Sequence, residues 1–583
     1  MVDTKKKKPS LLLTLGTAAL LVGGGGVAYW LVTQRGAGPG ELPVGAEIIP
    51  QDALMALSVS TDAGQWETLR QFGTAQSQAA VDQNLAGVRD RILTANGFDY
   101  EKDIKPWIGK EITVAFLAPQ AASPPSGGSG TLPPVPKNQQ STIMVLPVQD
   151  GGKAKETLER FKPQSGKSVD RTYQGIQIKE TQGAAAQNYS ATVLDGKLVV
   201  VTNDPKAMDR AIDTYKGGPA LAATPGYTQA LGKIQVAQSF GKLYVNLPAA
   251  AAVTAANSGK PISPQSLAQL QQVQGLAATA VLESEGIRFK SVSWLKPDSQ
   301  RRYDVSNTAK TMPGRLPADT LIMASGGNLQ QFWQDYSQGA TANPISPINP
   351  QGLRDGLKST IGMDLDKDFL PWMGGEFSLA LVAAPEGGSS SLPFGLVFMV
   401  QTNNRRAAED TLKRLDDAMA SKYKFKVEQS RLGDRPVTNW SLPVGGPTIT
   451  RGWMDGDVAF LTLGAPIANS MVPKPTTSLM DSPAFKTAVP TEPNPNNGHF
   501  FADVDRAINT KLPLLQLPPG NRDLVAAIRS LGVTAAISDD RTTRYDVFVW
   551  LQKGSKPGPL PSPKPAASPG AENPANSSPS PSP

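Results

Sequence analysis

The only histidine of the chain, His499, is the residue on which most acid–base or metal-ligand chemistry would have to depend. It would be the base of any Ser-His-Asp arrangement. It lies within residues 497–501, and the matching position in an earlier, similar segment is Lys242. A position that takes either histidine or lysine is typical of an exposed strand. We therefore assign His499 no catalytic role.

A second pattern, Ser421 followed by Lys424, has the Ser-x-x-Lys spacing of penicillin-binding enzymes, but their Ser-Asp-Asn and Lys-Thr-Gly elements are missing. The sequence also lacks Gly-x-Ser-x-Gly, a Walker phosphate loop and Gly-x-Gly-x-x-Gly. It contains no cysteine, which excludes disulfides, thiolate metal sites and cysteine nucleophiles. Carboxylate pairs for glycoside hydrolysis depend on spatial separation, and no local signature singles out one pair.

Two acidic triplets are the remaining candidates for chemistry. Residues 364–368 begin like a calcium-binding loop, Asp-x-Asp-x-Asp. The sixth position, which requires glycine, is Phe369, and the twelfth is Gly375 instead of glutamate; the triplet in residues 99–103 has Ile104 at its sixth position. Both triplets precede a Pro-Trp-x-Gly element, which favours a helix start or a turn. We predict no catalytic, cofactor-binding or metal-binding residues, and no cofactor.

Most of the body is an internal sequence repeat. Residues from about 49 to 295 recur, loosely but in order, from about 316 to 551. Residues 104–109 match residues 369–374 through the shared Pro-Trp-x-Gly. The repeat also pairs six tryptophans, namely Trp66, Trp107 and Trp294 with Trp333, Trp372 and Trp550. These side chains could line a ligand groove, but their recurrence in both copies favours a role as core anchors.

The N-terminal residues predict that the protein is anchored in a membrane. Lysines 5–8 precede an uncharged stretch, residues 9–34, that is long enough as a helix to cross a hydrocarbon core of about 30 Å. The lysines before it outnumber Arg35 after it, which predicts a cytoplasmic N-terminus. The alternative is a cleaved signal peptide, which has a shorter apolar region and a small-residue cleavage site. We expect a single-pass protein of the plasma or thylakoid membrane with its body in the periplasm or lumen.

The body is expected to have an α+β fold with largely antiparallel sheets and packed helices. Residues 197–202 and 242–247 are β-rich, and Asp-Gly at 195–196 indicates a hairpin turn. Asp204 and Pro205 predict the start of a helix with an apolar stripe. Strands and helices mix without regular alternation, which favours α+β over a parallel α/β fold.

The predicted organisation is two tandem homologous units between a transmembrane helix and a disordered Pro-rich tail. Most of the net charge of +7 lies in residues 1–40 and 552–583, so the body lacks the clustered basic face that nucleic acid requires. The segments are a cytoplasmic basic tip (1–9), a transmembrane helix (10–32), a linker (33–44), α+β unit one (45–298), a linker (299–312), α+β unit two (313–552) and a Pro/Ser-rich tail (553–583).

Residues 49–54, the segment around Trp66, residues 98–107 and the N-terminal span resemble the cyanobacterial membrane-anchored proteins of domain-of-unknown-function family 3352. The resemblance covers roughly residues 40–551 and implies an envelope or thylakoid setting without any known chemistry. We expect a non-enzymatic envelope protein that binds a protein partner or supports an assembly and contacts the membrane through its N-terminal helix. The alternatives are a carrier or chaperone for lipid or apolar polypeptide, and a hydrolase of envelope polymers.

Overall fold

The computed structural model describes residues 38–94, 98–118, 141–160, 167–182, 189–236, 238–257, 271–340, 349–385, 392–442, 448–510 and 525–562. The predicted cytoplasmic tip and transmembrane helix, and residues 563–583 of the predicted tail, lie outside this part of the chain. Within it, none of the helices has both the length and the apolar character needed to span a bilayer. The predicted α+β class with an antiparallel sheet is confirmed.

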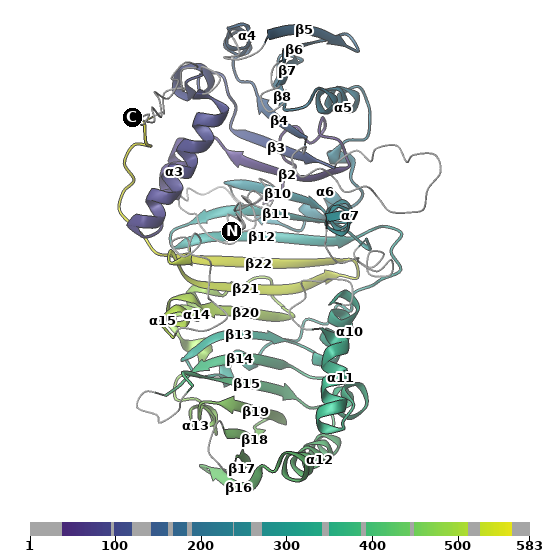
Figure 1. Ribbon diagram of the computed structural model, residues 1–583, viewed down its shortest axis with the longest axis vertical. Coiled ribbons are helices and arrows are strands. Elements are labelled where there is room, and N and C mark those ends of the chain that lie inside the picture. The colour runs from purple at the N-terminus through teal and green to yellow at the C-terminus, as the bar shows by residue number, and fades with distance from the viewer. Residues whose placement is uncertain are drawn as a thin grey trace, which may run out of the picture.

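In the described part of the chain, twenty strands form one continuous antiparallel sheet (Figure 1). In spatial order, its first half is β5 (Lys167–Tyr173), β6 (Ile176–Gln182), β7 (Ser190–Leu194), β8 (Leu198–Thr202), β4 (Thr142–Pro147), β3 (Glu111–Leu117), β2 (Ala53–Ser60), β10 (Gly241–Asn246), β11 (Val273–Glu283) and β12 (Gly286–Leu295).

The second half continues from β12 without a break. It consists of β22 (Thr542–Leu551), β21 (Ile528–Asp539), β20 (Gly498–Asp503), β13 (Thr320–Gly326), β14 (Phe377–Ala383), β15 (Phe394–Gln401), β19 (Val458–Gly464), β18 (Thr448–Met454), β17 (Arg435–Ser441) and β16 (Lys426–Leu432). The order of strands outward from the β12–β22 pair is therefore the same in both halves. A separate two-stranded ribbon joins β1 (Gly38–Pro39) to β9 (Gln235–Val236).

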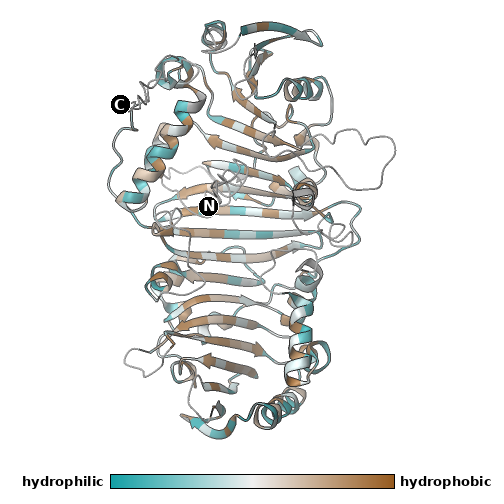
Figure 2. Ribbon diagram, viewed as in Figure 1, coloured by the Kyte–Doolittle hydropathy of each residue, from teal (hydrophilic) through white to brown (hydrophobic). Residues whose placement is uncertain are grey.

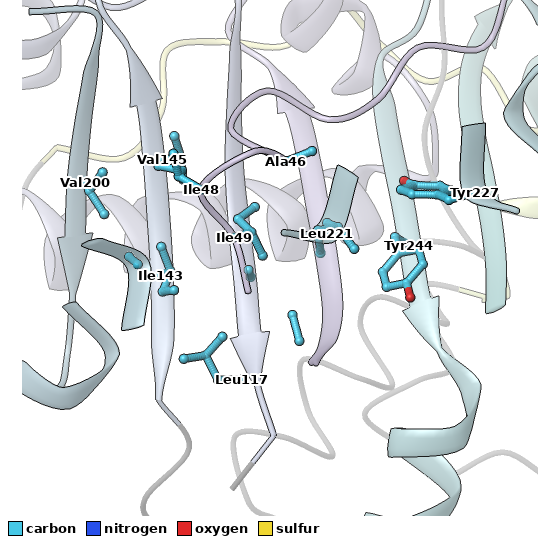
Figure 3. Close-up of a cluster of buried hydrophobic side chains, with 14 of the residues drawn as sticks. Ala46, Ile48, Ile49, Leu117, Ile143, Val145, Val200, Leu221, Tyr227 and Tyr244 are labelled. Atoms are coloured by element: carbon cyan, nitrogen blue, oxygen red, sulfur yellow. The ribbon is translucent and has the colours of Figure 1, made fainter. Parts of the chain in front are cut away.

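One face of the sheet, called here the inner face, carries the fully buried side chains of Ala56, Tyr244, Ala277 and Val292, which are aligned across four strands. Figure 3 shows the part of this core that lies over β2, β3, β4 and β10. The elements that pack on the inner face are α5 (Pro205–Tyr215), η4 (Leu221–Ala223), α6 (Tyr227–Leu231), α9 (Met312–Arg315), α13 (Ala468–Met471), η7 (Leu479–Asp481) and α14 (Pro483–Ala488).

Helix α5 follows the local rules that predicted it. The Asp204 side chain accepts a hydrogen bond from the Lys206 amide, and Pro205 occupies the first turn, where its missing N–H costs nothing. The predicted apolar stripe is confirmed, because Met208 and Ile212 are fully buried against the inner face.

The opposite face, called here the outer face, carries helices mainly over the ends of its strands (Figure 1). Apolar clusters attach these helices to Ile287, Val549, Phe377 and Val199. The helices that contribute to these clusters are α2 (Ala63–Leu69), α4 (Gly151–Glu159), α10 (Leu329–Ala340), α11 (Pro350–Ile361), α12 (Arg405–Tyr423) and α15 (Val504–Asn509). An ion pair from Arg70 to Asp82 holds α3 (Ala75–Ile92) to the end of α2.

Candidate functional site

A row of polar side chains crosses the inner face over ten neighbouring strands. Directly opposed residues of antiparallel strands point to the same face, so the pairing register places all ten side chains on one line. Small hydroxyl residues stand at equivalent places in the two halves, whereas the ionisable residues differ between them. The row is Thr113, Ser58, Lys242, Thr279, Lys290, Asp546, Thr534, His499, Ser325 and Ser378.

In the first half, the row contains a buried ion pair. The Lys242 side chain is only 10% exposed, and its Nζ lies 2.8 Å from Oε2 of Glu111, the first residue of β3. Lys242 Nζ also donates to the Leu42 carbonyl at 3.3 Å, and the Val44 amide donates to Glu111 Oε1 at 3.1 Å. The pair thus fastens the segment before β2 to the inner face of the sheet.

In the second half, His499 occupies the place of Lys242. Its Nδ1 lies 3.1 Å from the Thr534 hydroxyl, which itself donates to the Pro490 carbonyl at 2.5 Å. Because Thr534 has one hydroxyl proton, it can only accept from Nδ1–H of His499. Glu376, which corresponds to Glu111, accepts from the Thr311 amide at 2.7 Å. Burial lowers the pKa of His499, partly opposed by the negative charge of Glu376.

The expectation that Lys242 and His499 are exposed strand positions is wrong. Lys242 is buried and His499 is half-buried, because both point to the inner face, which segments outside the sheet cover. The His499 ring bonds a threonine that is already engaged with a carbonyl, which does not form a base–nucleophile pair. The described contacts of His499 thus link neighbouring elements, since Thr534 bonds both the His499 ring and the Pro490 carbonyl.

The lowered pKa of His499 gives a pH prediction. The folded-state pKa lies below the unfolded value of about 6.5, so the neutral ring stabilises the fold above that pH and the contribution is lost as the pH falls through the window below it. We expect the free energy of unfolding of the wild type, relative to His499→Gln, to decrease between pH 7 and pH 5 in urea titrations. A difference that is constant or grows on acidification would contradict the assignment. The buried Asp546, whose pKa burial raises, is common to both proteins and cancels in the difference.

A charged cluster joins the two halves where β12 pairs with β22. Arg288 of β12 donates to Asp546 of β22 at 3.1 Å and also pairs with Glu283. Its guanidinium lies 5.1 Å from the ring centre of Phe548, within cation–π range. Burial raises the pKa of Asp546, partly opposed by the Arg288 charge. These contacts link residues 258 positions apart in the chain.

The acidic triplets form turns, which confirms the predicted role. Asp99 accepts from the Lys102 amide at the start of η2 (Tyr100–Ile104). The Asp103 carbonyl accepts from Trp107 Nε1 and from Thr157, and its carboxylate pairs with Arg160. The second triplet repeats every contact around η5 (Leu365–Phe369) and η6 (Leu370–Trp372), through Asp364, Asp368, Trp372, Thr411 and Arg414.

The other candidates from the sequence are also accounted for by local contacts. The Ser421 hydroxyl donates to the Asp417 carbonyl one helical turn earlier, and Lys424 is the left-handed residue that ends α12. Among the residues that the structure describes, the side chains of histidine, aspartate and glutamate form no cluster that could hold a metal ion. Of the paired tryptophans, Trp107, Trp294, Trp333 and Trp372 are buried, as predicted for core anchors, whereas Trp66 and Trp550 are half-buried.

The outer face carries no comparable polar row, which sequence reasoning missed. One complete row across twelve strands is apolar, and most of its side chains remain half-exposed. Its members, in order, are Ile112, Val59, Gly241, Ala280, Phe289, Val547, Val533, Phe500, Ala324, Leu379, Phe398 and Leu461. The usual antiparallel sheet places apolar residues inside and polar residues outside. Here a polar row lies inside and an apolar row lies outside.

The apolar row belongs to a larger charge-free surface, defined as the outer-face positions in register on the fourteen strands from β8 to β19. None of these positions holds Asp, Glu, Lys or Arg. Three of its large side chains are openly accessible: Leu379 is 42% exposed, Leu463 38% and Tyr545 37%. Figure 2 shows hydrophobic residues recurring along these strands. Apolar surfaces of this extent mark binding sites on soluble proteins.

One signal in the sequence could have revealed this surface. In β15 nearly every residue is apolar, without the alternation of a strand that has one wet face. Strand β2 is similar, with Met55, Leu57 and Val59 on the outer face between inner-face residues. Such continuous runs predict strands that are covered on both sides, whereas the described helices on the outer face lie mainly over the ends of the strands (Figure 1).

The family model described as "Protein of unknown function (DUF3352)" matches residues 14–551. The chain belongs to this family. No curated protein matches the chain. Among solved structures, crystal form III of TP0453 is 11% identical and covers 44% of this chain and 81% of its own, with a TM-score of 0.24. Crystal form I of TP0453 gives the same TM-score at 10% identity, and covers 44% of this chain and 80% of its own. A TM-score of 0.24 is too low to indicate a shared fold.

Proposed function

We propose that this chain is a non-enzymatic binding protein that docks an apolar partner on its charge-free surface and acts as a scaffold for it. The observation that carries the proposal is that the outer face is apolar as well as the inner face, although the described helices lie mainly over the ends of its strands (Figure 1). Burying apolar area is worth about 25 cal/mol per Å², so leaving so many apolar side chains half-exposed is costly unless a partner covers them. Lys242, in contrast, is buried at the expense of desolvation on the other face.

A non-enzymatic role is supported by the way the reactive side chains are held. The His499 ring is hydrogen-bonded to Thr534. The carboxylates of Asp103 and Asp368 each pair with an arginine, and their backbone carbonyls accept a hydrogen bond from a tryptophan indole. Each of these groups serves a turn or a strand contact. A hydrolase using paired carboxylates would instead need two acidic groups facing one cleft.

We further propose that the two halves arose by duplication and that the protein is a single-pass, membrane-anchored protein of a cyanobacterial envelope or thylakoid membrane. The matched order of strands and the equivalent contacts of Asp103 and Asp368 support the duplication. The four lysines before the apolar stretch at residues 9–34 support an anchor with a cytoplasmic N-terminus and an exported body.

The proposed function is tested by placing the photo-crosslinking residue benzoylphenylalanine at single positions of the full chain in its host cells. We expect Leu379 and Tyr545 positions to give discrete adducts on illumination, because an apolar partner would cover them. Leu353 of α11 is the matched control, since it is equally exposed at 37% but lies outside the charge-free surface. Adduct yields at Leu379 and Tyr545 that do not exceed the yield at Leu353 would refute the proposal.

A further inference from the structure

The side chains of the charge-free surface indicate which chemical class of partner it binds. This inference rests on the proposed function. Its polar side chains are few, and all of them are uncharged hydroxyls. They are Thr142, Ser291, Ser293, Thr543 and Tyr545. Protein interfaces carry about one hydrogen bond per 100–200 Å² and a charged rim. This surface therefore has few side chains that could form hydrogen bonds or ion pairs with a protein partner. A hydrocarbon chain requires neither kind of interaction.

The backbone of the same strands has no free hydrogen-bonding groups for an added peptide strand. Every strand from β8 to β19 is paired on both sides, so its N–H and C=O groups are used within the sheet. Among the described residues, the unpaired edges of the sheet are β5 and β16, each three strands beyond the charge-free surface, where charged side chains such as Arg171 and Glu428 discourage strand addition. Recognition by strand addition is thus excluded on the charge-free surface.

The width of the surface also matters. Fourteen strands at about 4.8 Å spacing extend for roughly 60 Å. A single amphipathic helix, about 10 Å across, would cover roughly two strand spacings and leave the rest of the surface wet. Flexible hydrocarbon chains, in contrast, can follow a broad surface. Ala324 lies between the bulkier Phe500 and Leu379, and Gly241 lies beside Val59, which produces an uneven surface that flexible chains can follow.

We propose that the charge-free surface binds the acyl chains of lipid molecules taken out of the bilayer. The surface could bind single lipid molecules, or it could lie against the membrane to which the protein is anchored. The position of β1 favours the first of these. β1 pairs with β9, and Gly40 bonds the carbonyls of Leu231 and Ile234, which belong to the inner-face core. Residues 38–40, the first described residues after the proposed anchor, therefore lie on the inner side, opposite the charge-free surface.

The test uses membranes that contain the full chain, incubated with phosphatidylcholine vesicles in which one acyl chain carries a diazirine. After illumination, labelled peptides are mapped by mass spectrometry. We expect label on the strands that contain Leu379 and Tyr545. Leu379→Lys and Tyr545→Lys should each reduce it about tenfold, because a lysine under hydrocarbon must be desolvated. Leu353→Lys is the control and should leave the labelling unchanged. Leu379→Gln serves as a second variant if the lysine change alters the thermal unfolding midpoint.

The outcomes separate this inference from the proposed function. Label that is confined to residues 1–37, or that persists at full strength in both lysine variants, overturns the lipid assignment. If benzoylphenylalanine at Leu379 and Tyr545 then crosslinks to a polypeptide, the proposed function stands with a protein partner instead. If these positions crosslink to nothing and take no lipid label, both proposals fail.

Discussion

Replacing Glu111 with alanine is expected to lower the free energy of unfolding by about 3–5 kcal/mol, because the buried Lys242 ammonium loses its partner. Lys242 would keep the Leu42 carbonyl at 3.3 Å, a neutral acceptor, and the carboxylate of Glu41 at 4.0 Å, which is 85% exposed and therefore screened by water. The Val44 amide would also lose its acceptor, so the segment before β2 should loosen. Urea unfolding followed by tryptophan fluorescence measures the loss.

Two further variants test whether the unpaired Lys242 ammonium causes the loss of stability in Glu111→Ala. Lys242→Met combined with Glu111→Leu removes both charges and should recover most of the stability, since buried ion pairs are often replaceable by apolar residues. Glu376→Ala, the matched change in the second half, should cost less because Glu376 bonds Thr311 and faces a neutral histidine. If the double variant is as unstable as Glu111→Ala, or if Glu376→Ala costs as much, the explanation is wrong.

Trp107→Ala and Trp372→Ala are each expected to lower the free energy of unfolding by about 3–5 kcal/mol, the usual loss for a buried large aromatic residue. Trp107 is 2% exposed and Trp372 3%, and each indole donates to the carbonyl of an aspartate four residues earlier. The local environments are equivalent, so the two losses should be similar. Chemical denaturation of each single variant, followed by circular dichroism, gives the comparison.

The corresponding phenylalanine variants serve as controls for the tryptophan prediction. Trp107→Phe and Trp372→Phe retain an apolar ring but lose the indole hydrogen bond. The aspartate carbonyl keeps its bond from Thr157 or Thr411, so each variant should cost only about 1 kcal/mol. A loss that occurs in only one half would argue against equivalent units. Losses below about 1 kcal/mol for both alanine variants would show that the tryptophans do not anchor the core.

Several local features follow from the sequence because neighbouring residues supply all the necessary contacts. Helix α5 begins where Asp204 caps it and Pro205 enters its first turn. The acidic triplets form turns because Asp99 and Asp364 accept from amides two or three residues later. The Asp-Gly at residues 195–196 forms the turn between β7 and β8, with both residues at positive φ. These contacts span a few residues, so spacing alone is sufficient to predict them.

The faces of the sheet could not be predicted in the same way. Whether Lys242 is buried or exposed depends on which segment covers its face, and Leu42 and Glu111, which hold it, are 200 and 131 positions away. Alternation along a strand separates two faces but does not tell which one a distant segment will cover. The charge-free surface was missed because apolar residues on both faces of a strand are usually taken as core.

Local patterns of residues are enough to predict the α+β class, the antiparallel strands, the capped helix and the turns that precede the buried tryptophans. The pairing of distant strands, in contrast, places the two halves in one sheet through β12 and β22, puts Lys242 and His499 on its covered side, and leaves the charge-free surface on the other side. The physical reason is that local hydrogen bonds and side-chain periodicity act over a few residues, whereas burial depends on strand pairing between residues such as Arg288 and Asp546, 258 positions apart.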